Sequence, residues 1–184
     1  RIIDDACRTF LVEHPDAVVV NLGAGMDTRY SRLDNGRVLW FDLDLPEVIQ
    51  IREQLFERSK RMKFLAFTVS DFTWMSHVPR NRPALFIAEA LLSYLEEHEV
   101  KAIVRTIAER FPGSEMIAEA TSLPNCTAAA AGAMKKIPPV KWGVASLGDL
   151  ETWRSGVTLE EQWFPLDYYE NVVSLDLLTW LALR

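Results

Sequence analysis

The stretch Val18-Val19-Val20-Asn21-Leu22-Gly23-Ala24-Gly25-Met26-Asp27-Thr28-Arg29 decides the fold. It predicts a buried strand, because consecutive apolar β-branched residues are typical of strands. Gly23 and Gly25 predict a sharp turn, since glycine adopts backbone conformations closed to other residues and places no Cβ in the way of a ligand. Asp27 or Thr28 would cap the helix that follows. A strand, a glycine turn and a helix in this order are typical of α/β proteins that bind a nucleotide-like molecule.

Length and composition predict one globular domain. The chain has 184 residues, is 49% hydrophobic and carries a net charge of −6, which argues against a surface that grips nucleic acid. Cys7 and Cys126 are too few for a disulfide scaffold or a zinc site and are interpreted as buried reduced thiols. No metal site is expected.

The apolar runs are shorter than the roughly 20 residues that span a bilayer, and no secretory signal is visible. We therefore expect a cytoplasmic protein with no membrane partner. The chain opens with Arg1 in what reads as the middle of a helix, so we expect that residues of the natural protein precede it.

Strand-like and helix-like segments alternate along the chain. The predicted strands are residues 17–22, 38–41, 64–67, 84–88, 115–119, 157–164 and 177–183. The predicted helices are residues 2–13, 28–33, 47–59, 96–111, 124–134 and 147–155. This order predicts an α/β fold, a Rossmann-like, doubly wound and mostly parallel sheet of about seven strands with helices on both faces.

Polar residues follow four consecutive predicted strands, at the edge where such sheets bind ligands. They are Gly23 and Gly25, then Asp42 and Asp44, then Asp71, then Glu89. An acidic residue about 20 positions after a glycine turn is where ribose hydroxyls are held. Each residue also has a simpler interpretation: a tight turn for the glycines, a helix N-cap for Asp44, and a loop carboxylate or cap for Asp71. An unpaired buried carboxylate is costly, which makes Glu89 the hardest to explain without a ligand.

Two ligands fit this edge, a dinucleotide and S-adenosylmethionine. The dinucleotide fingerprint requires a third glycine where this chain has Thr28. S-adenosylmethionine has no phosphate and carries a sulfonium and an ammonium, so an acidic pocket suits it better. Asp71 would then bond the adenine amine and Phe72 would lie against the ring. Glu89 would face the cationic methionine end or the adjacent ribose.

Three blocks of sequence resemble the leucine carboxyl methyltransferase family, which includes polyketide O-methyltransferases of the tetracenomycin P type. The blocks are Asn21-Leu22-Gly23-Ala24-Gly25-Met26-Asp27-Thr28, Asp42-Leu43-Asp44-Leu45-Pro46-Glu47-Val48 and Ala88-Glu89-Ala90-Leu91-Leu92-Ser93-Tyr94-Leu95. The resemblance implies the class I S-adenosylmethionine-dependent methyltransferase fold over residues 1–184. Members of this family usually carry a helical N-terminal segment that covers the site, and we expect this segment to be missing here.

By matched position, the resemblance implies that Gly23 lines the methionine moiety, that Asp44 holds the ribose and that Arg1 lies near the cofactor carboxylate. Arg29 is interpreted as a structural salt-bridge residue. The residues expected to bind the cofactor are Arg1, Gly23, Ala24, Gly25, Asp42, Asp44, Asp71, Phe72 and Glu89.

We interpret the chain as an S-adenosylmethionine-dependent O-methyltransferase of small molecules, with a polyketide as one acceptor class. A carboxylate acceptor is ionised at pH 7 and needs no base, whereas a phenol needs one. The histidines His14, His77 and His98 offer no clear base, which favours a carboxyl acceptor or a hydroxyl positioned by the substrate; no catalytic residue is assigned. An NAD-linked oxidoreductase and a non-catalytic binding module are the alternatives.

Aromatic residues crowd the last third of the chain. They are Trp142, Trp153, Trp163, Phe164, Tyr168 and Tyr169. They would either line an aromatic substrate pocket or form core and a homodimer face, and the second interpretation is favoured.

Overall fold

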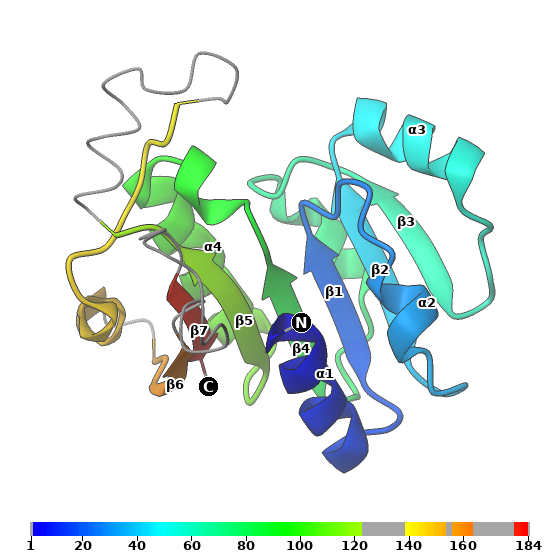
Figure 1. Ribbon diagram of the computed structural model, residues 1–184, viewed down its shortest axis with the longest axis horizontal. Coiled ribbons are helices and arrows are strands. Elements are labelled where there is room, and N and C mark those ends of the chain that lie inside the picture. Colours follow the sequence, from blue (N-terminus) through cyan, green and yellow to red (C-terminus); the bar gives the residue numbers. More distant parts are fainter. Residues whose placement is uncertain (1, 123–138, 154–155, 164–178, 184) are drawn as a thin grey trace, which may run out of the picture.

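The computed structural model describes residues 2–122, 139–153 and 156–163, and the backbone of 179–183. In this part of the chain the strands form one seven-stranded sheet in the order β3-β2-β1-β4-β5-β7-β6 (Figure 1). The strands are β1 Val18–Leu22, β2 Leu39–Asp44, β3 Met62–Ala66, β4 Ala84–Ala88, β5 Glu115–Ala120, β6 Leu159–Trp163 and β7 Thr179–Leu183. The first five pair in parallel, and β7 is antiparallel to both β5 and β6. The prediction of a mostly parallel sheet is confirmed.

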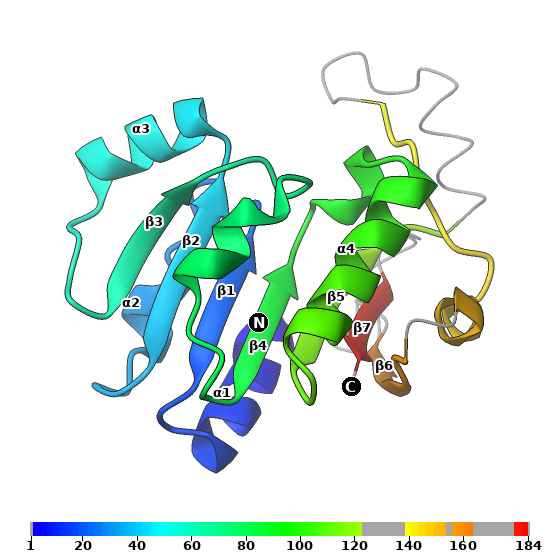
Figure 2. The same ribbon diagram turned by 180° about the vertical axis from the view of Figure 1, so that it is seen from behind.

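Helices cover both faces of this sheet, as predicted. They are α1 Ile2–Glu13, α2 Arg29–Leu33, α3 Pro46–Leu55 and α4 Glu97–Arg110, with 3-10 turns η1 Phe72–His77, η2 Leu92–Tyr94 and η3 Leu147–Trp153. The two opposite views show α1 and α2 on one face and α4 on the other (Figures 1 and 2). A capping box between Glu96 and Glu99 starts α4, and Pro46 starts α3 in the first-turn position that proline favours.

The β1 strand divides the core into two layers. Val18, Val20 and Leu22 pack in the cluster that includes the apolar side of α4, whereas Val19 packs in the cluster that includes α1. All five β1 residues are buried, because successive side chains point to opposite faces and both faces are covered. The burial of β1 anchors the glycine turn that follows it to the centre of the domain.

Several predicted boundaries differ from the structure. The β2 strand continues to Asp44 rather than ending near 41, because its parallel pairing with β3 extends to the pair Asp44 and Ala66. The α3 helix ends at Leu55 rather than near 59, and the predicted helix at 147–155 is the 3-10 turn η3. The η1 turn lies where neither a helix nor a strand was predicted. The predicted helix at 124–134 lies outside the described residues.

The aromatic residues of the last third of the chain fall into two groups, those that pack in the core and those that lie outside the described residues. Trp142 is 4% exposed and lies in the core with its ring 6.1 Å from that of Trp153, so these two belong to the core interpretation. Trp163 packs against the α1 side of the core. Phe164, Tyr168 and Tyr169 lie outside the described residues.

Cys7 is fully buried on α1, and burial raises the pKa of its thiol to about 12. The interpretation of Cys7 as a buried thiol is confirmed, and Cys126 lies outside the described residues.

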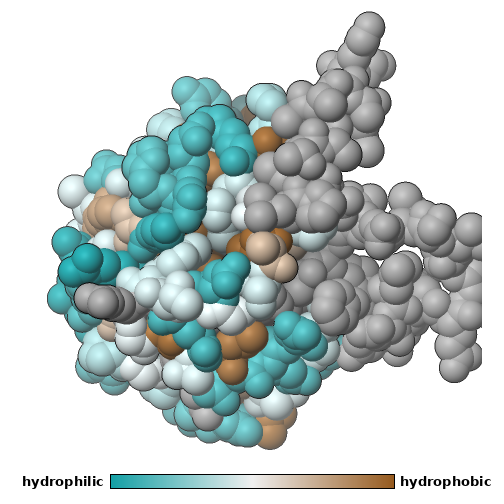
Figure 3. Space-filling model, turned by 90° about the vertical axis from the view of Figure 1, so that its left-hand side faces the viewer, coloured by the Kyte–Doolittle hydropathy of each residue, from teal (hydrophilic) through white to brown (hydrophobic). Residues whose placement is uncertain are grey.

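One side of the molecule presents mostly hydrophilic described residues, with hydrophobic ones in small separate patches (Figure 3). Among the described helices, none has the length and apolar character that crossing a bilayer requires.

Candidate cofactor site

The glycine turn is built from two residues in the left-handed region of the backbone. Gly23 has φ 65° and Gly25 has φ 47°, a conformation that side-chain-bearing residues rarely adopt. The amides of Gly23 and Ala24 both donate to the Leu43 carbonyl, at 2.8 and 3.1 Å. A Cβ at Gly23 would lie 3.0 Å from Leu91 Cδ1, whereas a Cβ at Gly25 would have no atom within 4 Å. The turn is therefore packed at Gly23 and open at Gly25, which fits the approach of a ligand to bare backbone.

Asp44 closes the turn from the neighbouring strand. Its Oδ2 accepts a hydrogen bond from the Gly25 amide at 2.7 Å, and its Oδ1 accepts one from the Leu45 amide at 2.7 Å. The α3 helix has Leu45 at its N-cap with no side-chain capping bond. The structure therefore places the Asp44 carboxylate on the glycine turn, and the simpler N-cap interpretation is wrong.

Asp42 does not lie at the ligand edge. It is 1% exposed, and its carboxylate pairs with Arg52 and accepts a 2.9 Å hydrogen bond from the Trp40 indole. Burial raises the pKa of Asp42, and the Arg52 guanidinium and the Trp40 donor oppose that rise. This burial conflicts with the expectation that Asp42 faces the cofactor. The β2 strand runs two residues further, so Asp44, and not Asp42, lies at its end.

Arg52 supports the glycine turn from beneath, and the sequence analysis did not identify it. It is fully buried on α3, and its Nη1 donates to the Gly25 carbonyl at 2.6 Å and to the Asp27 carbonyl at 3.1 Å. Its guanidinium also lies 4.7 Å from the centre of the Phe56 ring. The available signal was spacing, since Ile49, Arg52 and Phe56 fall on one face of the helix and an arginine on a core-facing stripe needs buried partners.

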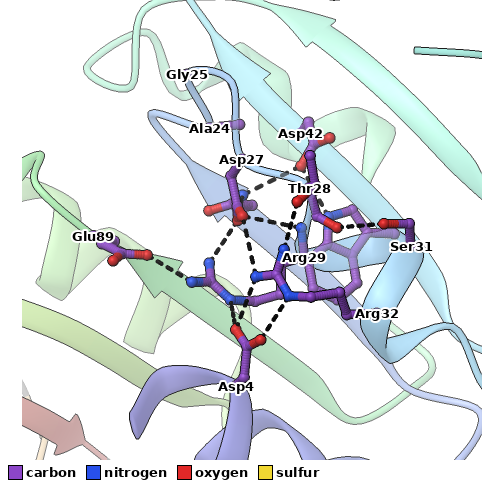
Figure 4. Close-up of polar contacts among 12 residues, drawn as sticks. Asp4, Ala24, Gly25, Asp27, Thr28, Arg29, Ser31, Arg32, Asp42 and Glu89 are labelled. Atoms are coloured by element: carbon purple, nitrogen blue, oxygen red, sulfur yellow. Dashed lines mark hydrogen bonds and ion pairs between the residues drawn. The ribbon is translucent and has the colours of Figure 1, made fainter. Parts of the chain in front are cut away.

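Arg29 connects three elements around the turn (Figure 4). Its guanidinium bonds Glu89 at 2.6 Å, Asp27 at 2.6 Å and Asp4 at 2.7 Å. Asp4 comes from α1, Asp27 from the glycine turn and Glu89 from the end of β4, and Arg32 adds a second cation to Asp4 at 2.7 Å. The Arg29 side chain is 5% exposed, while that of Glu89 is 41% exposed. Glu89 is thus held on one side and open on the other.

Asp71 and Phe72 lie apart from this cluster, on the turn after β3. Asp71 is the N-cap of η1 and accepts from the Thr73 hydroxyl at 2.7 Å and from the Thr73 amide at 3.1 Å. These bonds lower the pKa of Asp71. Phe72 is half-buried against the main core. The cap interpretation of Asp71 is confirmed, and its side chain is exposed.

The remaining predicted residues are placed as follows. Ala24 is 3% exposed in the middle of the turn, and Arg1 lies outside the described residues. His14 packs on Phe10 with ring centres 4.8 Å apart, His77 packs on Phe67 at 5.5 Å, and His98 is exposed on α4. Among the described residues no group of His, Cys, Asp and Glu is placed to hold a metal ion.

Comparison with known families places this edge of the sheet in context. The profile described as leucine carboxyl methyltransferase matches residues 1–108, which contain the glycine turn, Asp44, Asp71 and Glu89. The chain belongs to the leucine carboxyl methyltransferase family. The predicted resemblance is confirmed, and membership of this family supports S-adenosylmethionine as the cofactor.

One relative of the chain is TcmP of Streptomyces glaucescens, a tetracenomycin polyketide synthesis O-methyltransferase. The two are 32% identical over 179 residues, a match that covers 91% of this chain and 63% of the relative. The chain therefore spans less than two thirds of the length of that relative.

Solved structures agree on the fold of this family member. A Thermobifida fusca structure described as a methyltransferase matches all of this chain and 78% of its own, with a TM-score of 0.76 and 17% identity. An O-methyltransferase from neocarzinostatin biosynthesis, NcsB1, in complex with S-adenosylmethionine and 2-hydroxy-5-methyl naphthoic acid, has a TM-score of 0.61 at 16% identity. That match covers 98% of this chain and 56% of NcsB1. The predicted class I methyltransferase fold is confirmed.

Proposed function

We propose that residues 1–184 form one domain of an S-adenosylmethionine-dependent O-methyltransferase that acts on a carboxyl or hydroxyl group of a small molecule. The observation that carries the proposal is the Asp44 carboxylate bonded to the Gly25 amide, at the open side of a glycine turn. The relation to TcmP, whose name places it in tetracenomycin polyketide synthesis, favours a polyketide-like acceptor.

The residues at this edge fit the cofactor by shape and by charge. A carboxylate has about four lone-pair sites, so Asp44 can bond the turn and still accept from ribose hydroxyls. Gly25 leaves the backbone open for the methionine end, whereas Gly23 packs against Leu91. The open side of Glu89 offers a negative charge to a sulfonium or ammonium.

Three further residues complete the proposed site. Asp71 and Phe72 would flank the adenine from the turn after β3, and Arg1 would lie near the cofactor carboxylate. Asp42 would act from beneath, through Arg52 and the turn, instead of touching the cofactor.

Bound S-adenosylmethionine supplies an activated methyl group, and the chain supplies alignment. Holding two reactants in line contributes up to roughly 7–11 kcal/mol to lowering the barrier. His14 and His77 pack on aromatic rings, and His98 is exposed on α4. An acceptor that is already ionised, such as a carboxylate, suits this set of residues because it needs no base.

Calorimetric titration with S-adenosylhomocysteine, S-adenosylmethionine and NAD tests the cofactor. Wild-type protein should bind the first two and not NAD. Asp44→Asn should weaken binding by about 10- to 100-fold, the loss of charge-assisted hydrogen bonds worth about 1.5–3 kcal/mol. Asp16→Asn is the matched control, because Asp16 pairs with Arg37 on the exposed surface. Binding of NAD alone would refute the proposal and favour an oxidoreductase.

Transfer of a labelled methyl group to a panel of aromatic carboxylic acids and phenols tests the reaction. We expect carboxyl methylation that survives replacement of His77 by Ala. Cofactor binding without transfer to any acceptor class would favour a non-catalytic binding module. Phenol methylation abolished by the loss of one histidine would show that a base is used.

A further inference from the structure

The turn after β4 contains a residue in an uncommon conformation. Ala90 has φ 50°, and among the described residues it is the one non-glycine position with positive φ. The Cβ of an L-residue crowds the backbone in this left-handed region. Such a conformation persists only where the surrounding structure holds it, and it is found preferentially at functional sites.

A buried carboxylate on the adjacent strand holds this turn. Glu119 lies on β5 and is 7% exposed, and its Oε2 accepts a hydrogen bond from the Ala90 amide at 2.9 Å. Burial raises the pKa of Glu119; the Ala90 amide opposes the rise and the charge of Glu89 adds to it. A buried carboxylate that feels the charge of a second carboxylate is costly, so the presence of Glu119 here favours a role beyond packing.

The two neighbours of Ala90 both belong to the candidate cofactor site. Glu89, before it, is bonded to Arg29 at 2.6 Å. Leu91, after it, packs against the glycine turn, so that a Cβ at Gly23 would lie 3.0 Å from Leu91 Cδ1. A rotation at Ala90 would therefore redirect Glu89 and Leu91 together.

We propose that Glu119 is a positioning residue, whose carboxylate fixes the left-handed Ala90 and thereby sets Glu89 towards Arg29 and Leu91 against Gly23. The consequence for cofactor binding rests on the proposed function. The role of Glu119 in fixing the conformation of the turn at Ala90 does not depend on that function. In this scheme Glu119 acts through the backbone amide of Ala90, in the turn after the neighbouring strand β4, and touches neither Glu89 nor the cofactor.

Reach and charge are separated by two conservative variants of the full chain. Glu119→Asp keeps the charge but withdraws the oxygen by one methylene, and should weaken S-adenosylhomocysteine binding about tenfold. Glu119→Gln keeps an oxygen at the same reach and should stay within about threefold of wild type. Adding Ala90→Gly to Glu119→Asp should restore most of the affinity, because glycine adopts positive φ without steric cost. Glu109→Asp, on the exposed face of α4, is the matched control.

Amide hydrogen exchange at Ala90 supplies a readout that needs no ligand. Exchange should be slow in wild type and in Glu119→Gln, and at least tenfold faster in Glu119→Asp. Unchanged exchange and affinity in Glu119→Asp would overturn the proposal. So would an equal loss with and without Ala90→Gly, since that would show a general packing role. If wild type binds no S-adenosyl ligand, the proposed function fails and the exchange rates alone decide the role of Glu119.

Discussion

Replacing Arg29 by Met should destabilise the fold strongly. The guanidinium is 5% exposed and bonds three carboxylates, those of Asp4, Asp27 and Glu89, at 2.6–2.7 Å. Methionine fills a similar volume without charge, so the carboxylates lose their shared cation while Arg32 still contacts Asp4. Removal of one partner from a buried ion pair costs about 3–5 kcal/mol. We expect the free energy of unfolding to fall by about this much. The loss should not exceed the range, because Glu89 is 41% exposed and its carboxylate can regain water.

Urea unfolding followed by tryptophan fluorescence measures this loss. Arg105→Met is the matched control, since Arg105 pairs with Glu109 on the exposed surface of α4 and should cost no more than about 0.5 kcal/mol. The difference in unfolding free energy between Arg29→Met and wild type should narrow as the pH falls from 4 towards 2, because wild type then loses the stability that the Asp4 carboxylate gains from its arginine partners. An Arg29→Met variant as stable as Arg105→Met, or a gap independent of pH, would refute the view that Arg29 holds these elements together.

Two further perturbations follow from the same region. Gly23→Ala should cost about 1–3 kcal/mol through left-handed strain and the contact with Leu91. Gly25→Ala, which meets no atom within 4 Å, should cost about 1–2 kcal/mol from strain alone; equal unfolding midpoints would argue against the Leu91 contact. Burial raises the pKa of Asp4, but hydrogen bonds from Arg32 and Arg29 outweigh it and lower the pKa from 3.8 to about 2. Because the folded pKa is depressed, about 2 kcal/mol of stability is present above pH 4 and is lost between about pH 4 and pH 2. Asp4→Asn should lack this acid-sensitive part in urea titrations at several pH values, and a parallel pH profile for both proteins would contradict the assignment.

Much of the fold was predictable from residue periodicity. A continuous apolar run such as Val18–Val20 is typical of a strand that is covered on both faces, and β1 is buried throughout. The end of β2 was not predictable, because Asp42 and Asp44 look alike in sequence and differ only in what β3 and α3 bring to them. Where a strand ends depends on its neighbours, and local composition does not contain that information.

The candidate site was predictable in its parts but not in its connections. The glycine turn and Glu89 follow from residue types at strand ends. The link between them could not be predicted, because the partners of Arg29 are distant in sequence. Asp4 lies 25 positions before Arg29, and Glu89 lies 60 positions after it. The partners of Arg52 and Glu119 were missed for the same reason, because each side chain bonds the backbone of a turn that is distant in sequence.

The buried Arg52 also orients the peptide groups above it. In a trans peptide the carbonyl and the amide point in opposite directions. Arg52 lies 3.4 Å from the Ala24 carbonyl and 2.6 Å from that of Gly25, so the following amides are turned away from it. The Gly25 amide does point outward, towards Asp44. A cation sealed below the turn thus aligns the backbone dipoles, and the amide that it turns outward is the one that holds the Asp44 carboxylate in place.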